Sequence, residues 1–485
     1  MNSEIRNLEP KELWNKFADL NAVPRPSKKE ERVIAFMKNF GESLELSVII
    51  DAIGNVLIKK PATAGMENRK TVVMQAHLDM VHQKNADTIF DFDTQGIEMY
   101  VDGDWVRAKG TTLGADNGLG VATIMAILES NDIPHPAIEA LFTIDEETGM
   151  TGAMGLQPNW LQGDILLNLD TEEDDEIGVG CAGGIDVTAE RMYKEEAVGE
   201  GKKGYTIAIT GLNGGHSGMD IHKGLGNANK IMNRVLYGKF EKFGLRIHKI
   251  KGGSLRNAIP RESFATIVID IEQSEVFEAE IASLTEVIKK ELMPVDPNVS
   301  IKLNSIGIPN SVMEIKAQED VLKSLYAAHN GVYAMSLSIP DLVETSNNIA
   351  KVTIANGSIK IECLTRSSVA SGKTDMVNTL TAIFKLIGCD VLTDGDYPGW
   401  APNMNSSILK VLDEVYQKIN GEKAHIAACH AGLECGILGQ NYPEMDMISF
   451  GPTILGAHSP DERASISSAK KYWRFVKEIL QNIPV

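Results

Sequence analysis

The sequence contains no hydrophobic run long enough to cross a membrane and no excess of basic residues. A membrane-spanning helix needs about 20 consecutive apolar residues, and no stretch of these 485 residues approaches that length. The formal net charge of −19 at pH 7 argues against nucleic acid as a general partner, because phosphate binding requires a basic face. We therefore expect neither a membrane nor a nucleic acid among the partners of this protein.

Cysteine is scarce and follows no recognisable spacing. The five cysteines, an odd number, are widely spread and include no Cys-x-x-Cys pair. This distribution is typical of reduced thiols and does not indicate a disulfide framework or a structural zinc site. The first residues, MNSEIRNLEPKELW, also lack the apolar core of a signal peptide. Together these features favour a cytoplasmic protein.

The length and the changing texture of the chain indicate more than one domain. A chain of 485 residues exceeds what one simple core accommodates. Helical and strand-like stretches alternate over residues 1–186. Residues 187–390 instead have alternating strand patterns with interleaved helices. Residues 391–485 return to the pattern of the first part. We predict an α/β domain with a mostly parallel sheet, built from 1–186 and 391–485, and an inserted α+β domain at 187–390.

Three strand-like runs in the first part end in acidic or imidazole side chains. The runs 72–74, 137–144 and 164–169 are followed by His77 with Asp79, by Glu146 with Glu147, and by Asp170. An acidic turn after a strand is usually only a solvated loop. Three in succession favour a site, because ligands in open α/β sheets lie beyond the carboxyl ends of the strands.

A glycine-rich loop, GTTLGADNGLG at residues 110–120, runs into a helical pattern at 121–128. A dinucleotide-binding turn is the obvious alternative, but the third glycine is not at the right place. Asp116 at the centre of the loop would also be a poor neighbour for a pyrophosphate. On a tight loop flanked by glycines, Asp116 is instead well suited to bridging two metal ions.

These side chains, with His458 after a last apolar run at 444–451, form a set suited to metal ions. Two imidazoles and three carboxylates can hold two divalent metals about 3.5–4 Å apart if one carboxylate bridges them. Adjacent Glu146 and Glu147 point in different directions at a strand end. One of them can therefore bind metal while the other faces the attacking water.

Five separated motifs, QAHLDM, GTTLGADNGLG, TIDEETG, NLDTEE and GPTILGAHSP, carry a specific resemblance. In this order they resemble the motifs of the zinc-dependent dipeptidases and aminoacylases with a co-catalytic metal pair. The HAGLECG stretch at 430–436 resembles the aminoacyl-histidine dipeptidase branch of that superfamily. The resemblance covers nearly the whole chain and implies a di-metal catalytic domain with an inserted lid and dimerisation domain. It further implies hydrolysis of dipeptides, including Xaa-His dipeptides.

The resemblance implies a metal ligand set of five residues. One metal would be bound by His77, Asp116 and Asp170, and the other by Asp116, Glu147 and His458. The family implies two divalent ions per chain, expected to be Zn²⁺, with Co²⁺ or Mn²⁺ as alternatives.

Two further acidic residues receive roles from the same resemblance. Asp79 matches the aspartate that orients the first histidine, and Glu146 matches the general base. The resemblance also implies a cis peptide bond between Asp116 and Asn117.

Residues of the inserted domain match groups that contact the substrate. His216 matches a histidine that reaches over the substrate carbonyl, while Asn257 and Arg366 match residues that grip the substrate. Arg366 is suited to a bidentate contact with a terminal carboxylate. From the residues alone, these three could equally be a loop histidine, a turn residue and a surface cation. His430 and Glu434, in the branch motif, are assigned to the amino end of the substrate.

The expected partners are therefore a dipeptide substrate and a second copy of the chain. In such a homodimer we expect His216 to act at the site of the other subunit. The alternatives are an amidohydrolase that deacylates N-acyl amino acids with the same metals and Glu146, and a non-catalytic member of the same fold. A two-metal phosphatase uses similar ligands, but no motif here resembles one.

Overall fold

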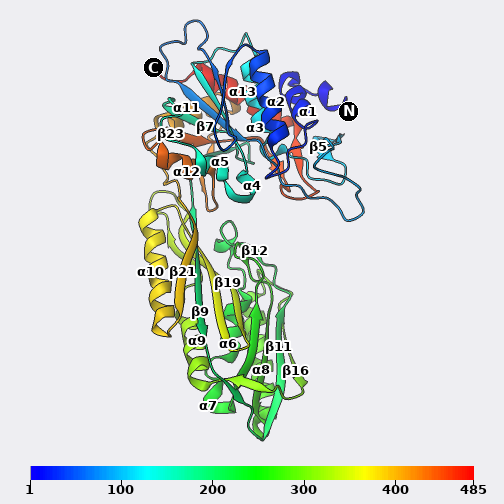
Figure 1. The fold of residues 1–485 in the computed structure, drawn as a ribbon, viewed down its shortest axis with the longest axis vertical. Coiled ribbons are helices and arrows are strands. Elements are labelled where there is room, and N and C mark those ends of the chain that lie inside the picture. The colour runs from blue at the N-terminus through cyan, green and yellow to red at the C-terminus, as the bar shows by residue number, and fades with distance from the viewer. Residues whose placement is uncertain (1) are drawn as a thin grey trace. The chain divides into compact units, whose positions relative to one another are not determined.

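The computed structural model describes residues 2–485, which form two compact units. Unit 1 comprises residues 2–180, Trp400–Ala428 and Leu433–Val485, and unit 2 comprises Cys181–Gly399 with Cys429–Gly432. The blue N-terminal elements and the red C-terminal helix thus belong to the same unit (Figure 1). The chain leaves and re-enters unit 1 near residues 180 and 400, where the sequence suggested 187 and 390. The difference arises because the strands Gly183–Met192 and Asp390–Tyr397 pair with each other in the sheet of unit 2.

The main sheet of unit 1 has eight strands. In spatial order they are β1 (Ser47–Ile50), β2 (Val56–Lys60), β6 (Ile138–Thr143), β3 (Val72–His77), β7 (Ile165–Asn168), β23 (Asp446–Ser449), β8 (Glu176–Cys181) and β22 (His425–Cys429). The four central strands, from β6 to β23, are parallel to one another. β1, β2 and β8 flank them in antiparallel pairings. This arrangement confirms the α/β class with a largely parallel central sheet.

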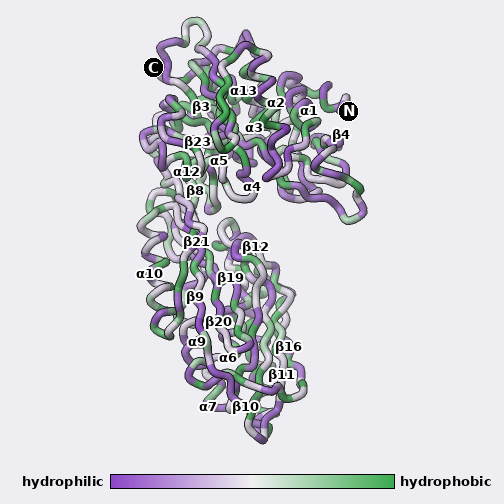
Figure 2. Tube along the Cα trace, viewed as in Figure 1, coloured by the Kyte–Doolittle hydropathy of each residue, from purple (hydrophilic) through white to green (hydrophobic). Residues whose placement is uncertain are grey.

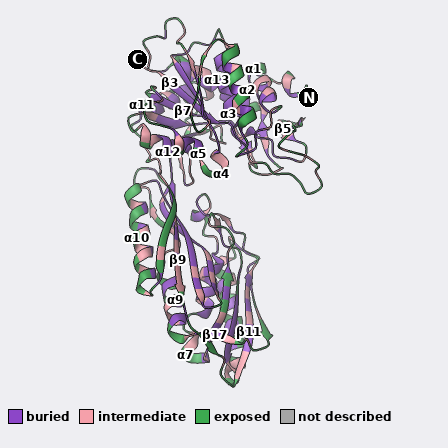
Figure 3. Ribbon diagram, in the orientation of Figure 1, coloured by how far each residue is buried: buried purple, intermediate pink, exposed green. Residues whose placement is uncertain are grey.

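The central strands are largely apolar because both of their faces are covered. Every residue of β3, β6 and β7 is buried, as Figure 3 shows for β3 and β7. Parallel strands buried on both faces carry near-continuous apolar sequences, and polar groups then gather where the strands end.

Helices and a small sheet complete unit 1. The helices are α1 (Lys11–Leu20), α2 (Glu31–Ser43), α3 (Ala115–Glu129), α4 (Glu146–Gly149), α5 (Thr151–Gly155), α11 (Ser407–Asn420), α12 (Glu434–Asn441) and α13 (Ile466–Gln481). The small sheet has the order β24 (Ile454–Leu455), β25 (Arg463–Ser465), β5 (Trp105–Ala108) and β4 (Met99–Asp102). α3 is buried on nearly all sides and packs against β3, which explains why its sequence is apolar all round.

Unit 2 is built on an antiparallel sheet. This arrangement confirms the α+β class expected for the inserted part of the chain. The strands run β16 (Ser300–Ile306), β11 (Lys202–Thr210), β15 (Ser263–Asp270), β13 (Arg246–Gly252), β19 (Val343–Ala355), β20 (Ser358–Ser367), β9 (Gly183–Met192) and β21 (Asp390–Tyr397), with β18 (Gly331–Met335) beside β19. Hydrophobic and hydrophilic residues alternate along these strands (Figure 2), as expected for a sheet with one covered face.

The helices of unit 2 pack against this sheet around a large apolar core. They are α6 (Ala228–Leu236), α7 (Lys239–Phe243), α8 (Ser274–Leu292), α9 (Ile315–Ala327) and α10 (Ala370–Leu386). Two short pairs, β10 (Glu195–Ala197) with β17 (Ser311–Met313) and β12 (Gly215–His216) with β14 (Ala258–Ile259), lie outside the main sheet. Within residues 2–485, no helix combines the length and the apolar character that crossing a membrane requires.

Candidate active site

The carboxyl ends of the central strands of unit 1 carry the residues singled out in the sequence. β3 pairs in parallel with β6 on one side and with β7 on the other, with His77 beside Thr143 and Gln75 beside Asn168. The strands therefore end at one edge of the sheet. The side chains that follow them meet there, although they are up to 381 residues apart in the chain (His77 to His458).

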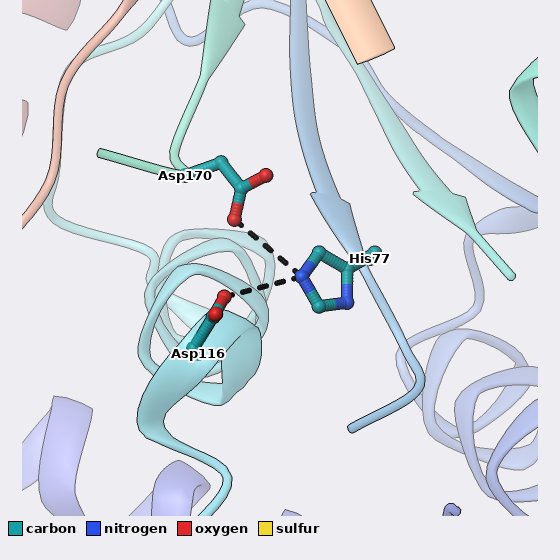
Figure 4. A group of neighbouring side chains, drawn as sticks. All are labelled: His77, Asp116 and Asp170. Carbon is teal, nitrogen blue, oxygen red and sulfur yellow. Dashed lines mark hydrogen bonds and ion pairs between the residues drawn. The ribbon is translucent and has the colours of Figure 1, made fainter. Parts of the chain in front are cut away.

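His77, Asp116 and Asp170 form a first group of metal-binding side chains. The Nε2 atom of His77 lies 3.2 Å from Asp116 Oδ1 and 3.5 Å from Asp170 Oδ1. Figure 4 shows both carboxylates directed at this one ring nitrogen, from the start of α3 and from the loop after β7. The histidine side chain is 1% exposed, so the group is closed off by the sheet behind it.

Asp116, Glu147 and His458 form a second group. The Nε2 atom of His458 lies 3.3 Å from Asp116 Oδ2 and 2.9 Å from Glu147 Oε2. Asp116 therefore turns one oxygen towards each group. This is the geometry of a carboxylate that bridges two ions.

The residues present fit two divalent cations. Within each group the potential ligand atoms all lie within 4.8 Å of one another. Donors placed about 2.0–2.2 Å from a tetrahedral ion are about 3.3–3.6 Å apart, close to the separations seen here. Among the described residues, the buried Oε1 of Glu147 has no hydrogen-bond partner, and a cation would supply one. A nitrogen and oxygen donor set of this kind suits zinc and similar divalent ions.

Asp79 is in contact with His77, as predicted, and also with the acidic pair. Its Oδ1 lies 3.3 Å from His77 Nδ1. Its two oxygens accept the backbone N–H groups of Glu146 at 3.0 Å and Glu147 at 3.2 Å. Burial alone would raise the pKa of Asp79, but the contacts with His77 and these donors hold it below its ordinary value. One carboxylate thus fixes an imidazole and the start of α4.

Glu146 is the first residue of α4 and directly precedes Glu147 of the second group. Burial raises the pKa of Glu146 well above its ordinary value, and the nearby carboxylates of Asp170, Glu434 and Glu147 raise it further against the opposing effect of His77. A carboxylate with a raised pKa is a better general base near neutral pH than an ordinary glutamate.

The glycine-rich loop brings Asp116 to both groups. The peptide bond between Asp116 and Asn117 is cis, as the family resemblance implied, and Gly114 has a left-handed φ of 68°. Asn117 donates a hydrogen bond to Asp170. A Cβ on Gly120 would lie 1.9 Å from Asn117 Oδ1. The glycines of this loop therefore serve close packing.

Glu434 is buried behind the first group. Its Oε2 accepts hydrogen bonds of 2.6 Å from Gln75 and from Thr143, which project from β3 and β6. Burial raises the pKa of Glu434 to about 8. Within the described residues these contacts link Glu434 to the sheet below His77.

Arg366 is the centre of a polar cluster in unit 2. Its guanidinium donates to Tyr397 Oη at 2.7 Å and to Ser217 Oγ at 3.4 Å, and the residue is 4% exposed. Among residues 2–485 no carboxylate forms an ion pair with it. A buried cation without a counter-ion favours an anionic ligand.

His216 and Asn257 lie beside this arginine in unit 2. The Nδ1 atom of His216 accepts N–H groups of Gly218 at 3.2 Å and Met219 at 3.0 Å, and its Nε2 lies 3.4 Å from Arg366 Nη2. Asn257 is exposed, and its carbonyl oxygen accepts the N–H of Ser217 at 2.8 Å. The three lid-side residues are therefore neighbours.

His430 belongs to the same cluster, whereas Glu434, four residues later, belongs to unit 1. The Nε2 atom of His430 lies 2.8 Å from Ser346 Oγ. Burial, together with the charges of Arg366 and His216, lowers the pKa of His430 to about 3. The two candidate residues of the HAGLECG motif, His430 and Glu434, therefore belong to different units.

Sequence reasoning missed two buried residues at the site, Arg25 and Glu462. Glu462 accepts hydrogen bonds from the backbone of the glycine-rich loop, and Arg25 donates to that loop from the other side. Arg25 is in the Pro-Arg-Pro break between two helices, and Glu462 is four residues after His458. The only indication that the sequence could have given for either residue is a charge at a position expected to be buried.

Comparison with known proteins identifies the family. Residues 73–482 match the model described as peptidase family M20/M25/M40, and the chain belongs to that family. The cytosol non-specific dipeptidase of Escherichia coli (strain K12) is 45% identical over 482 residues, which cover 99% of each chain. These findings confirm the family resemblance carried by the motifs.

Solved structures agree with this family membership. The aminoacylhistidine dipeptidase of Vibrio alginolyticus superposes with a TM-score of 0.92 and 44% identity, covering 99% of this chain and 98% of that one. The aminopeptidase PepT of Bacillus cereus ATCC 10987 has a TM-score of 0.58 at 16% identity and covers 98% and 99%. The second likeness shows only that the fold is shared.

Proposed function

We propose that this protein hydrolyses the peptide bond of dipeptides, Xaa-His dipeptides included, with two Zn²⁺ ions per chain held by His77, Asp116, Glu147, Asp170 and His458. The observation that carries the proposal is the Asp116 carboxylate, which turns one oxygen to each histidine-containing group. The dipeptidases to which the chain is 45% and 44% identical support the substrate class.

The reaction divides between the cations and the residues around them. When bound, the two cations supply a Lewis acid for the scissile carbonyl and make a water molecule more acidic. Glu146 accepts the proton of that water as it attacks, and then passes the proton to the leaving amine. Asp79 keeps His77 and the start of α4 in place while this happens, because it contacts both.

Arg366 is assigned to the terminal carboxylate of the substrate. It is buried and is held by Tyr397 and Ser217, and among the described residues no carboxylate lies within ion-pair distance of it. A paired arginine and carboxylate place the chain end at a fixed point. That contact would restrict the enzyme to short peptides.

His216 is assigned to the oxyanion that forms on the scissile carbonyl, with Asn257 beside it. Because Nδ1 accepts two backbone N–H groups, the neutral imidazole carries its proton on Nε2. Nε2–H and the Arg366 Nη2 group are then two donors 3.4 Å apart, and an acceptor on the substrate satisfies both. His430 and Glu434 are buried against Ser346, Gln75 and Thr143. Burial favours a supporting role for both over direct contact with the amino end.

A panel of three substrates tests the function. We expect the metal-loaded protein to hydrolyse a Xaa-His dipeptide and to act weakly on the corresponding tripeptide and on an N-acetyl amino acid. Preference for the N-acetyl compound would identify an amidohydrolase instead, and no turnover of any of the three would identify a non-catalytic member.

The remaining assignments concern assembly and compartment. We propose a cytoplasmic homodimer in which His216 acts at the partner's metal pair. Within residues 2–485 no disulfide joins any two of the five cysteines, which fits a reducing compartment. Mixing Glu146→Gln chains with His216→Ala chains tests action in trans, because one site of a mixed dimer would then hold both intact residues. Mixed dimers that form without regaining activity would show that His216 acts within its own chain.

A further inference from the structure

Glu462 is a buried carboxylate that accepts hydrogen bonds from four consecutive backbone N–H groups. Its Oε2 accepts those of Leu113 at 2.6 Å and Gly114 at 2.9 Å. Its Oε1 accepts those of Ala115 at 2.7 Å and Asp116 at 3.2 Å. Both oxygens are therefore satisfied at a residue that is only 2% exposed.

The Glu462 carboxylate accepts the N–H groups at the start of α3, as the side chain of a helix-capping residue does, although it is distant in the sequence. The first N–H groups of a helix have no partner within it, and Gly114, which precedes α3, has no side chain to supply one. Glu462 supplies the acceptor from 346 residues away. A buried carboxylate is costly unless it is hydrogen-bonded, so this contact fixes the backbone from residue 113 to 116 firmly.

Arg25 holds the same turn from the other side. Its guanidinium donates to the carbonyl oxygen of Gly114 at 2.5 Å and to those of Leu78 and Asp79 at 3.0 Å each. The residue is 1% exposed. A Cβ at position 114 would lie 2.6 Å from Arg25 Nη2, so glycine permits this approach.

We infer that Glu462 and Arg25 are positioning residues that set where the Asp116 carboxylate lies between His77 and His458. Glu462 joins the turn to the segment that carries His458, and Arg25 joins it to the segment that follows His77. Both act through backbone groups and neither belongs to the ligand groups. The inference rests on the proposed metal pair and names the residues that allow one carboxylate to serve both ions.

Substitution of Glu462 by Gln tests the inference with little change of shape. An amide offers one acceptor oxygen and turns an NH₂ donor towards two of the four N–H groups. Metal affinity should fall by about 10–100-fold, as for other residues that support metal ligands. The matched control is Asp461→Asn, which removes the same charge one residue earlier at an exposed side chain and should leave affinity unchanged.

The measurement is a titration of the metal-free full-length protein with Co²⁺, followed by its visible spectrum and by calorimetry, with circular dichroism to check folding. Weaker binding and an altered cobalt spectrum in a folded Glu462→Gln protein support the inference. Unchanged affinity and spectrum in that variant overturn it. A wild-type protein that binds no cobalt overturns the metal pair itself, and the inference falls with it.

Two further variants cover other outcomes. If Glu462→Gln does not fold, Glu462→Asp takes its place. Its side chain keeps the charge but is one methylene shorter, so this variant should fold and bind metal more weakly. If neither folds, Glu462 serves the fold as a whole and the positioning claim is wrong. Arg25→Lys keeps the charge but cannot span three carbonyl oxygens, and should also weaken binding; unchanged binding would remove Arg25 from the inference.

Discussion

The adjacent residues Glu146 and Glu147 are positioned through their backbone N–H groups by the same side chain. Both N–H groups are held by Asp79, yet the side chains have different surroundings. Glu147 Oε2 lies 2.9 Å from His458 Nε2, whereas Glu146 belongs to neither ligand group and has a raised pKa. In the proposed mechanism this difference makes one residue a ligand and the other a base.

Substitution separates the two roles. Glu146→Gln should keep two metals per chain while turnover falls by about 10²–10⁴-fold, because only the proton acceptor is lost. Glu147→Gln should lose metal as well. The measurement is metal content per chain together with steady-state kinetics. Equal metal loss in both variants would show that the assignment of the pair is wrong.

Arg366 offers a second test at the residue level. Arg366→Met should raise KM for dipeptides by about 10–100-fold, because a hydrogen bond to a charged group contributes about 1.5–3 kcal/mol. A dipeptide amide, which lacks the carboxylate, should lose little further in the variant. The control is Lys360→Met, which removes a half-exposed cation from the same strand. An equal loss with the acid and the amide would contradict a carboxylate contact.

The sequence indicated the proposed ligands but not the residues that hold the loop around Asp116. His77, Asp116, Glu147, Asp170 and His458 stand in recognisable motifs and meet at one sheet edge. Arg25 and Glu462 act on backbone carbonyl and N–H groups far away in the chain. No local sequence pattern indicates such a contact, because every residue has backbone groups to which a distant side chain can bind.

At the level of elements, the loop that leads into α3 is held through its backbone by both Arg25 and Glu462. The sequence predicted the helix from residue 121, whereas α3 begins at Ala115. Asp116 and Asn117 have non-helical backbone angles within it, and Glu462 accepts the N–H groups of Ala115 and Asp116. The central strands were easier to predict, because burial on both faces leaves an unbroken apolar signal.

Gly120 tests this constraint. A Cβ there would lie 1.9 Å from Asn117 Oδ1 and 2.7 Å from the carbonyl oxygen of Leu169, and Leu169 directly precedes Asp170. Gly120→Ala should therefore destabilise the protein by about 1–3 kcal/mol, as overpacking does, and weaken metal binding. Denaturant unfolding and metal titration measure the two effects. Gly199, where an added Cβ meets nothing within 4 Å, is the control, and an equal effect of Gly199→Ala would contradict the account.

At the level of the whole molecule, the proposed metal ligands and Glu146 belong to unit 1, while Arg366, His216 and Asn257 belong to unit 2. We assign catalysis to the first unit and substrate binding to the second. The sequence indicated this division from its change of texture. The pairing of β9 with β21, which places residues 183–186 and 391–397 in the sheet of unit 2, is a long-range contact that no local pattern indicates.

Metal removal should destabilise the protein. Three carboxylates are crowded with two imidazoles at one sheet edge, and a ligand that binds only the folded state adds about 4 kcal/mol at a thousandfold excess over its Kd. A chelator should lower the melting temperature, and added Zn²⁺ should restore it. In His77→Ala the shift should be smaller. An equal shift in that variant would show that the metal responsible lies elsewhere.

The most direct test of the metal pair is a titration of the metal-free protein with Zn²⁺ while the hydrolysis of a Xaa-His dipeptide is followed. The account predicts no turnover without metal, and activity that rises with added Zn²⁺ until it saturates at two ions per chain. Asp116→Asn should not reach the wild-type rate at any loading, because one bridging oxygen is replaced by an amide nitrogen. Hydrolysis by the metal-free protein, or full activity with a single ion, would contradict the account.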